Sequence, residues 1–366
     1  MNARLSKFTN WLIEQNQDFA YIHSPSNVFY LSNFHCEPHE RLLGLFVVPN
    51  HEPFLVCPGM EVSQARDAGW EYDIIGYSDS DQPFDFIYEA LKERGVHQPA
   101  NASIEKGTLA YERAEELQTR YPELRYHSAE LGLNPLRLIK DEKEIEVLRE
   151  AAALADFGVE TGVDALREGV TEMEVLATIE FELKKKGIRE MSFSTMVLFG
   201  EKSGQPHGNP GERQLKKGDF VLFDLGVVLN GYCSDITRTV AFGEINEKQK
   251  KVYETVLNAQ TESLTISKPG TRLGDIDLAA RNIISNAGFG EHFPHRIGHG
   301  IGIEVHEYPS MSEKNDSLLQ VGMTYTIEPG IYLPDLGGVR IEDDVLVTED
   351  GYETLTKYPK ELQIIK

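Results

Sequence analysis

The sequence predicts an α+β protein of two domains, a small α/β domain followed by a larger α+β domain. Three observations support this prediction. The chain has 366 residues, which exceeds one ordinary core and suits two. Short strand-like runs alternate with helical patterns over roughly the first 130 residues, as in a small α/β domain. The remainder combines long amphipathic helices with strands that suit an antiparallel sheet.

The first domain is expected to end at residue 131. There the stretch Leu-Gly-Leu-Asn-Pro-Leu, residues 131–136, breaks the pattern and is predicted to be a linker. The domains would then be residues 1–131 and 132–366. In the first domain we expect helices over 4–15, 84–94 and 111–120, and strands over 19–22, 28–31, 42–48, 53–56 and 102–104.

The second domain is expected to open with a long amphipathic helix. Apolar residues recur on one side of residues 141–166. A second helix begins at Thr171, which Glu174 follows three residues later in capping-box order. The expected helices are 141–166, 171–186, 247–267 and 273–287, and the expected strands are 191–198, 220–228, 232–242, 323–331 and 339–348.

Composition excludes several functional classes. The chain carries 36 Lys+Arg against 59 Asp+Glu, a net charge of −23, so it would repel nucleic-acid backbones. Its three cysteines, at positions 36, 57 and 233, form no CxxC pair and favour a reducing compartment. The N-terminal residues contain neither a signal-peptide pattern nor a membrane span. We therefore expect a soluble, cytoplasmic protein with no nucleic-acid or membrane partner.

A predicted hairpin contains two unusual acids. Asn230-Gly231 is a strong signal for a two-residue turn, and such a turn places Asp224 opposite Thr237, with Asp235 one diagonal step away on the same face. Two close carboxylates are destabilising unless a cation neutralises them. Alternatively, one acid pairs with Arg238 and the other is exposed. The hairpin alone does not distinguish these interpretations.

Two further acids interrupt apolar runs. Glu328 lies within a predicted strand that breaks at Pro329-Gly330. In the last predicted strand, alternation places Arg340 and Glu342 on one face and Ile341 on the other. A single buried acid is commonly part of a structural ion pair. Four such acids on separate strands are better explained by a shared site.

Two histidines are candidates for the same site. Glycines flank His299 on both sides, so a ligand can approach its ring closely. His207 lies in a turn-rich Gln-Pro-His-Gly-Asn segment after a predicted strand. Each motif alone is weak, because an isolated histidine is more often a hydrogen-bonded core residue.

Together these motifs predict a site for two divalent cations. Its ligands would be Asp224, Asp235, His299, Glu328 and Glu342. Four carboxylates balance the charge of two such ions, and oxygen-rich ligation favours Mn²⁺, with Co²⁺ or Zn²⁺ as alternatives. Two metals about 4 Å apart can share a bridging water and lower its pKa, giving a hydroxide nucleophile.

The motifs, in this order, resemble the pita-bread metallopeptidases, the group of methionine aminopeptidase, aminopeptidase P and prolidase. The matching stretches are FDLG with SDITRT, PHG, GHGIGIEVHE, TIEPGIY and GGVRIED. The resemblance extends from Arg137 to near the C-terminus. It implies a pita-bread catalytic domain with a creatinase-like domain before it.

The resemblance also implies a role for each residue. Asp224 would bind one metal, His299 and Glu328 the other, and Asp235 and Glu342 both. His207 and His306 match the family's two catalytic histidines that are not ligands. Arg340 matches an arginine behind the ligands, and Glu328 would also move the proton of the bridging hydroxide.

The separate N-terminal domain is similar to that of the proline-specific members and of creatinase. Creatinase lacks these metal ligands, so hydrolysis of Xaa–Pro bonds in short peptides is the expected activity. We expect a dipeptidase of the prolidase type, with aminopeptidase P as the main alternative and a non-catalytic binding protein as another. The family also suggests a homodimer. Prolidases tend to carry an arginine after the HE-x-P motif, whereas here Lys314 is the nearest cation.

Overall fold

The computed structural model describes residues 3–366, and the chain divides into two compact units that meet between Arg137 and Leu138. The predicted linker over 131–136 is instead part of helix α6 (Glu130–Leu138), so the pattern break was misinterpreted. Gly132 lies directly against the Trp11 ring, which leaves no room for a side chain. Packing of α6 within the first unit therefore explains the glycine that suggested a linker.

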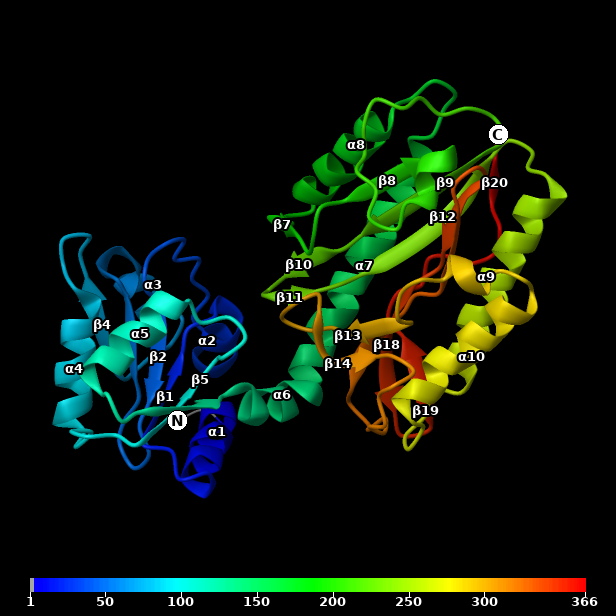
Figure 1. Ribbon diagram of the computed structural model, residues 1–366. Helices are drawn as coiled ribbons and strands as arrows, with labels where there is room; N and C mark the ends of the chain where they lie inside the picture. Colours follow the sequence, from blue (N-terminus) through cyan, green and yellow to red (C-terminus); the bar gives the residue numbers. More distant parts are fainter. Residues whose placement is uncertain (1–2) are drawn as a thin grey trace. The chain divides into compact units, whose positions relative to one another are not determined.

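The first unit is a six-stranded mixed sheet in the order β4-β3-β2-β1-β5-β6 (Figure 1). Pairing is parallel at both edges and antiparallel among β1, β2 and β3. Its strands are β1 (Phe19–Ile22), β2 (Gly44–Val47), β3 (Phe54–Pro58), β4 (Asp73–Tyr77), β5 (Asn101–Ile104) and β6 (Arg125–Ser128). Its other helices are α1 (Ala3–Glu14), α2 (Pro25–Ser32), α3 (Val62–Asp67), α4 (Pro83–Glu93) and α5 (Tyr111–Arg120).

The strand expected over 28–31 is wrong, because these residues lie in helix α2. Ser24 caps this helix by accepting a hydrogen bond from the Asn27 backbone N–H, and Pro25 occupies its first turn. These start signals outweigh the aromatic and branched residues that suggested a strand.

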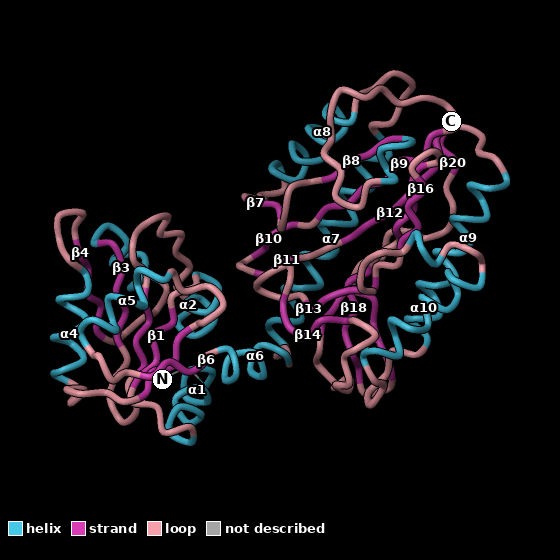
Figure 2. Tube along the Cα trace, in the orientation of Figure 1, coloured by secondary structure: helices cyan, strands magenta, loops and turns pink. Residues whose placement is uncertain are grey.

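The second unit has two helix pairs, each packed on a sheet (Figure 2). Its helices are α7 (Glu142–Asp164), α8 (Glu172–Lys185), α9 (Glu247–Thr265) and α10 (Leu273–Asn286). One core joins α7 and α8 to the sheet β20-β12-β9-β8, and the other joins α9 and α10 to the sheet β14-β13-β15-β18-β19. This arrangement agrees with the expected pita-bread domain. No helix within residues 3–366 is long and apolar enough to cross a membrane.

The five strands expected in this unit are each divided in two. The observed strands are β7 (Glu190–Met191), β8 (Met196–Phe199), β9 (Asp219–Leu225), β10 (Val227–Leu229), β11 (Tyr232–Cys233), β12 (Ile236–Phe242), β13 (Gly298–Gly300), β14 (Glu307–Met311), β15 (Thr324–Ile327), β16 (Gly330–Leu333), β17 (Gly337–Arg340), β18 (Asp343–Thr348), β19 (Gly351–Thr354) and β20 (Ile364–Ile365). Three of the divisions contain a predicted site acid: Asp235, Glu328 or Glu342.

Gly226, at the division between β9 and β10, offers a test of how closely two backbone segments pack there. A Cβ added there would lie 1.8 Å from the Ser234 carbonyl oxygen. We expect Gly226→Ala to lower the free energy of unfolding by about 2 kcal/mol, because backbone must shift to admit the methyl group. Chemical denaturation would measure the loss. Gly107→Ala is the control, since its Cβ would meet only Glu130 Oε1, at 3.6 Å; equal losses in both variants would contradict the interpretation.

Candidate metal centre

The Asn230-Gly231 turn positions the first two acids as predicted. Both turn residues have positive φ, 49° and 84°, as a type I′ turn requires. The turn joins β10 to β11, and the register places Asp224 opposite Thr237. Asp235 lies in the short gap before β12. Both carboxylates line one pocket.

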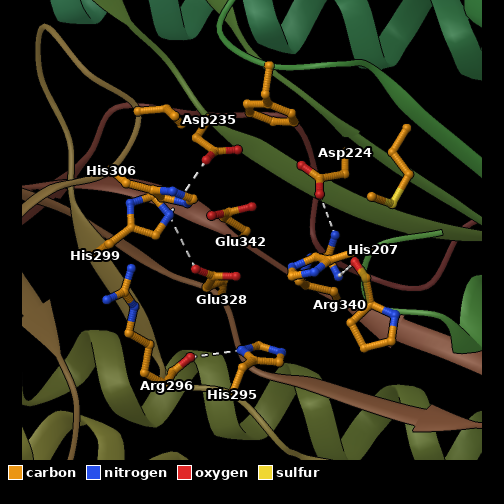
Figure 3. Close-up of a pocket in the computed structure, with 14 residues that line it drawn as sticks. His207, Asp224, Asp235, His295, Arg296, His299, His306, Glu328, Arg340 and Glu342 are labelled. Atoms are coloured by element: carbon orange, nitrogen blue, oxygen red, sulfur yellow. Dashed lines mark hydrogen bonds and ion pairs between the residues drawn. The ribbon is translucent and has the colours of Figure 1, made fainter. Parts of the chain in front are cut away.

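This pocket, of about 410 Å³, contains all the predicted site residues (Figure 3). Its volume is within the usual range of small-ligand sites, ~300–1,000 Å³. The predicted residues that line it are His207, Asp224, Asp235, His299, His306, Glu328, Arg340 and Glu342. Residues as far apart in the sequence as His207 and Glu342 therefore meet in one cavity.

Three of the predicted ligands are close enough to hold one ion. Ligand atoms of Asp235, His299 and Glu342 all lie within 4.8 Å of one another, and all three residues are buried. Glu328 extends this group, because its Oε1 lies 3.4 Å from His299 Nε2. Asp224 lies on the Arg340 side of the pocket, where the guanidinium contacts its carboxylate.

The His299 ring is oriented as a neutral ligand. Its Nδ1 lies 3.2 Å from the Gly300 carbonyl oxygen, so Nδ1 carries the proton and Nε2 has a free lone pair. That lone pair points toward the carboxylates of Asp235, at 3.8 Å, and Glu328. Burial lowers the His299 pKa to about 3, which keeps the imidazole neutral.

The carboxylates are buried at a high electrostatic cost. Burial, followed by repulsion from neighbouring acids, raises the pKa of Asp235 and of Glu342 well above the usual range. Burial also raises the pKa of Glu328, to about 7. In addition, Asp235 Oδ1 is buried without a hydrogen-bond partner among residues 3–366. An unpartnered oxygen in a group of like charges is what a site for divalent cations requires, so these residues fit such ions.

Arg340 connects the acids to the wall of the pocket. Its Nη2 donates to Asp224, its Nε donates to Thr237 Oγ1 at 3.0 Å, and its Nη1 donates to the Tyr332 hydroxyl at 2.9 Å. Thr237 Oγ1 in turn donates to Glu342 Oε2, at 2.6 Å. The guanidinium therefore fixes two predicted ligands, one directly and one through a threonine.

The alternative interpretation of the hairpin is wrong. Arg238 does not line the pocket and pairs with Asp343, with 2.7 Å between Nη2 and Oδ1. Neither Asp224 nor Asp235 is exposed. The arginine beside the hairpin acids in the sequence therefore does not neutralise them.

The two predicted catalytic histidines border the pocket from different segments. His207 is exposed on the loop before β9, and Arg340 Nη1 approaches the carbonyl oxygen of the preceding Pro206 at 3.4 Å. His306 packs edge-on against His299, with 4.2 Å between the ring centroids. Both side chains line the pocket that contains the carboxylates.

Sequence reasoning missed three polar residues of the site. His295 and Arg296 line the pocket, and the Tyr332 hydroxyl bridges Arg340 and His295 Nε2. Tyr332 could have been found, because it lies two residues after Gly330, which pairs with Arg340. Arg296 could have been suspected as a site residue because it lies just before the Gly-His-Gly motif. Lys314, the cation that the sequence suggested, does not line the pocket.

Comparison with known proteins identifies the family. The model of metallopeptidase family M24 matches residues 146–349, more than half of the chain, and that of the creatinase/prolidase N-terminal domain matches residues 4–139. The chain belongs to metallopeptidase family M24. The expected creatinase-like domain and pita-bread domain are thereby confirmed. Membership in this family also implies divalent metal ions.

Several relatives cover the full length of this M24 peptidase. YkvY of Bacillus subtilis (strain 168), provisionally named a dipeptidase, is 61% identical over 99% of both chains. The solved structure of an Xaa-Pro dipeptidase from Bacillus anthracis has a TM-score of 0.91 at 35% identity and 99% coverage of both chains. That of an X-Pro aminopeptidase from Thermotoga maritima MSB8 has a TM-score of 0.86 at 29% identity, covering 98% of this chain and 99% of that one.

The raised pKa values predict proton release when the M24 peptidase binds metal. In the metal-free site Asp235 and Glu342 retain protons to a higher pH than ordinary carboxyl groups, and a cation displaces the protons that they hold. Apparent affinity should therefore fall as pH falls. Calorimetric titration with Mn²⁺ in two buffers of different ionisation enthalpy would measure the release. Identical binding enthalpies in both buffers would show that the carboxylates are already ionised.

Proposed function

We propose that this M24 peptidase is an Xaa–Pro dipeptidase that hydrolyses its substrate with two divalent cations. The observation that carries the proposal is the presence of Arg296 in the pocket beside the acidic cluster. A dipeptide, unlike a longer peptide, has its C-terminal carboxylate next to the scissile bond. An enzyme restricted to dipeptides therefore needs a cation at this distance from its catalytic groups.

Arg296 is suited to that task because no acidic side chain pairs directly with it in the described part of the chain. Among residues 3–366 it forms no ion pair, and its Nη1 donates only to the Ser310 hydroxyl, at 3.1 Å. The other pocket arginine, Arg340, is already paired with Asp224. A guanidinium binds a carboxylate through two parallel hydrogen bonds, which gives both strength and orientation.

The predicted ligand set is proposed to hold the ions. Asp224 would bind one, His299 and Glu328 the other, and Asp235 and Glu342 both. The close grouping of three of these residues and the unpartnered Asp235 oxygen support this assignment. The oxygen-rich set favours Mn²⁺, with Co²⁺ or Zn²⁺ as alternatives. When bound, such ions lower the pKa of water and polarise the scissile carbonyl.

The remaining residues act on the substrate and on its protons. His207 and His306 would donate hydrogen bonds to the carbonyl oxygen as it gains negative charge. Glu328 would accept the proton of the attacking water and pass it to the leaving proline nitrogen. Arg340 would keep Asp224 and, through Thr237, Glu342 in position.

The wall of the pocket is suited to a proline ring. Phe193, Met196 and Val305 present apolar surface beside the charged groups. The nitrogen of an Xaa–Pro bond has no hydrogen to donate, so recognition must come from shape and from the carboxylate. An apolar wall with one cation nearby provides both.

Aminopeptidase P activity on longer peptides is the second candidate, favoured by the similarity to the Thermotoga maritima aminopeptidase. A non-catalytic binding protein would need no complete set of ionisable groups in its pocket. A creatinase-like hydrolase is disfavoured by the retained acids.

Paired substrates test the first candidate against the second. We expect the Mn²⁺-loaded protein to hydrolyse Ala-Pro and to leave Ala-Pro-Ala largely intact. Arg296→Met should raise KM for Ala-Pro by ~10-fold or more, because a charge-assisted anchor is lost. Lys314→Met is the control, since Lys314 is exposed outside the pocket. Equal or faster release of Ala from Ala-Pro-Ala would make the protein an aminopeptidase.

Metal content separates the ligands from the catalytic histidines. We expect Asp235→Ala to lose most of its bound metal, because this residue is assigned to both ions. His207→Ala should retain near-normal metal and lose about 100-fold in kcat, as when one donor to a developing oxyanion is removed. Elemental analysis and steady-state kinetics measure the two effects. Equal metal loss in both variants would show that the roles are wrongly assigned.

A further inference from the structure

Arg296, the pocket arginine proposed to bind the substrate carboxylate, lies on a segment without regular secondary structure. Residues 293–297 belong to no helix or strand, and Arg296 itself is exposed. Such a segment does not fix its own conformation, so contacts from outside must orient the side chains that it carries. Two residues of α10, Asp277 and Arg281, supply these contacts.

We propose that the Asp277–Arg281 pair positions Arg296 and thereby sets the preference for substrates with a free C-terminal carboxylate. This inference rests on the proposed dipeptidase function. Arg281 is a positioning residue here, because it does not line the pocket and forms no hydrogen bond with a predicted metal ligand.

Arg281 holds the segment by two carbonyl groups. Its Nη1 donates to the Phe293 oxygen at 3.1 Å, and its Nη2 donates to the His295 oxygen at 2.6 Å. The guanidinium also lies over the Phe293 ring, 4.5 Å from its centroid. These contacts fix the backbone immediately before Arg296.

Asp277 holds the other side of Arg296. Its Oδ1 accepts a hydrogen bond from the Ile297 backbone N–H at 2.8 Å. The same carboxylate accepts from Arg281 Nε at 2.8 Å and from Nη2 at 3.1 Å. One ion pair therefore contacts residues 293, 295 and 297, and Arg296 lies within this frame.

Stability alone does not account for this pair. Asp277 is fully buried, and a buried ion pair is frequently no more stabilising than apolar residues of similar volume. A different feature distinguishes it: all its hydrogen bonds outside α10 go to backbone atoms of one short segment. This arrangement determines where the Arg296 side chain leaves the backbone.

A lysine cannot reproduce these contacts. The planar guanidinium serves two carbonyl oxygens and a carboxylate at once, whereas an ammonium group is a single flexible point charge. Arg281→Lys retains the positive charge beside Asp277 but loses the planar group that donates several hydrogen bonds at once. It therefore separates loss of geometry from loss of charge.

The test compares Ala-Pro with Ala-Pro amide, whose C-terminus is uncharged, using Mn²⁺-loaded protein. We expect Arg281→Met to raise KM for Ala-Pro by about tenfold and to leave kcat and the KM for the amide nearly unchanged. Arg281→Lys should fall between wild type and Arg281→Met. In the Arg281→Met/Arg296→Met double variant the effects should not add, because both act on one contact.

Arg272→Met is the matched control. Arg272 lies at the start of the same helix and also holds a backbone carbonyl and nearby acids, but it contacts Glu313 and Asp316 instead. It should leave KM for both substrates unchanged. Circular dichroism and metal analysis check that each variant is folded and contains metal. If Arg281→Met fails either check, Arg281→Lys is used for the test instead.

The outcomes separate this inference from the proposed function. If wild type shows no preference for Ala-Pro over the amide, carboxylate recognition itself is wrong. If Arg296→Met abolishes a clear preference and the Arg281 variants do not reduce it, only the positioning role is overturned. An equal rise in KM for both substrates, or additive effects in the double variant, would also overturn it.

Discussion

Buried negative charge is the constraint on which the site depends. Asp224, Asp235, Glu328 and Glu342 line one pocket. Desolvation and repulsion from neighbouring acids both raise the pKa of Asp235, Glu328 and Glu342 and so disfavour their ionised forms. The chain relieves only part of this cost, because Arg340 contacts one acid directly and a second through Thr237. The protein leaves the rest of this negative charge unbalanced, and cations from solution can balance it.

Two adjacent residues show that the unbalanced negative charge is confined to the pocket. Glu342 and Asp343 are both buried, yet their pKa values shift in opposite directions. Burial would raise the pKa of Asp343, but Arg238 and Lys360 outweigh it and hold that pKa below its usual range. Glu342 faces the pocket with Thr237 as its hydrogen-bond donor. Cations of the protein thus stabilise the acid behind the site, while the acid within it is left for a metal.

The sequence predicted those features that follow from short-range backbone rules. Asn230-Gly231 determined the pairing of Asp224 with Thr237, because a two-residue turn leaves one register. The apolar runs around the acids indicated burial. Arg296 was not found, because its direction depends on contacts with α10, and no local pattern encodes such contacts. Helix α2 was mistaken for a strand because side-chain composition was given more weight than its Ser-Pro start.

The broken strands, which caused most errors of boundary, are also what assembles the site. In a regular strand successive side chains alternate between faces, so acids from different sheets would not converge easily. Each of the three breaks that contain a site acid frees a backbone N–H, and another segment accepts a hydrogen bond from it. The Asp235 N–H donates to Asp344 Oδ2 at 2.9 Å, that of Glu328 to the Ile297 oxygen at 2.8 Å, and that of Glu342 to the Thr237 oxygen at 3.0 Å. The irregular backbone is therefore paired, not strained, and burial does not penalise it. The positions of the carboxylates depend on these main-chain contacts, so a change that restored a continuous strand would separate the ligands without replacing one.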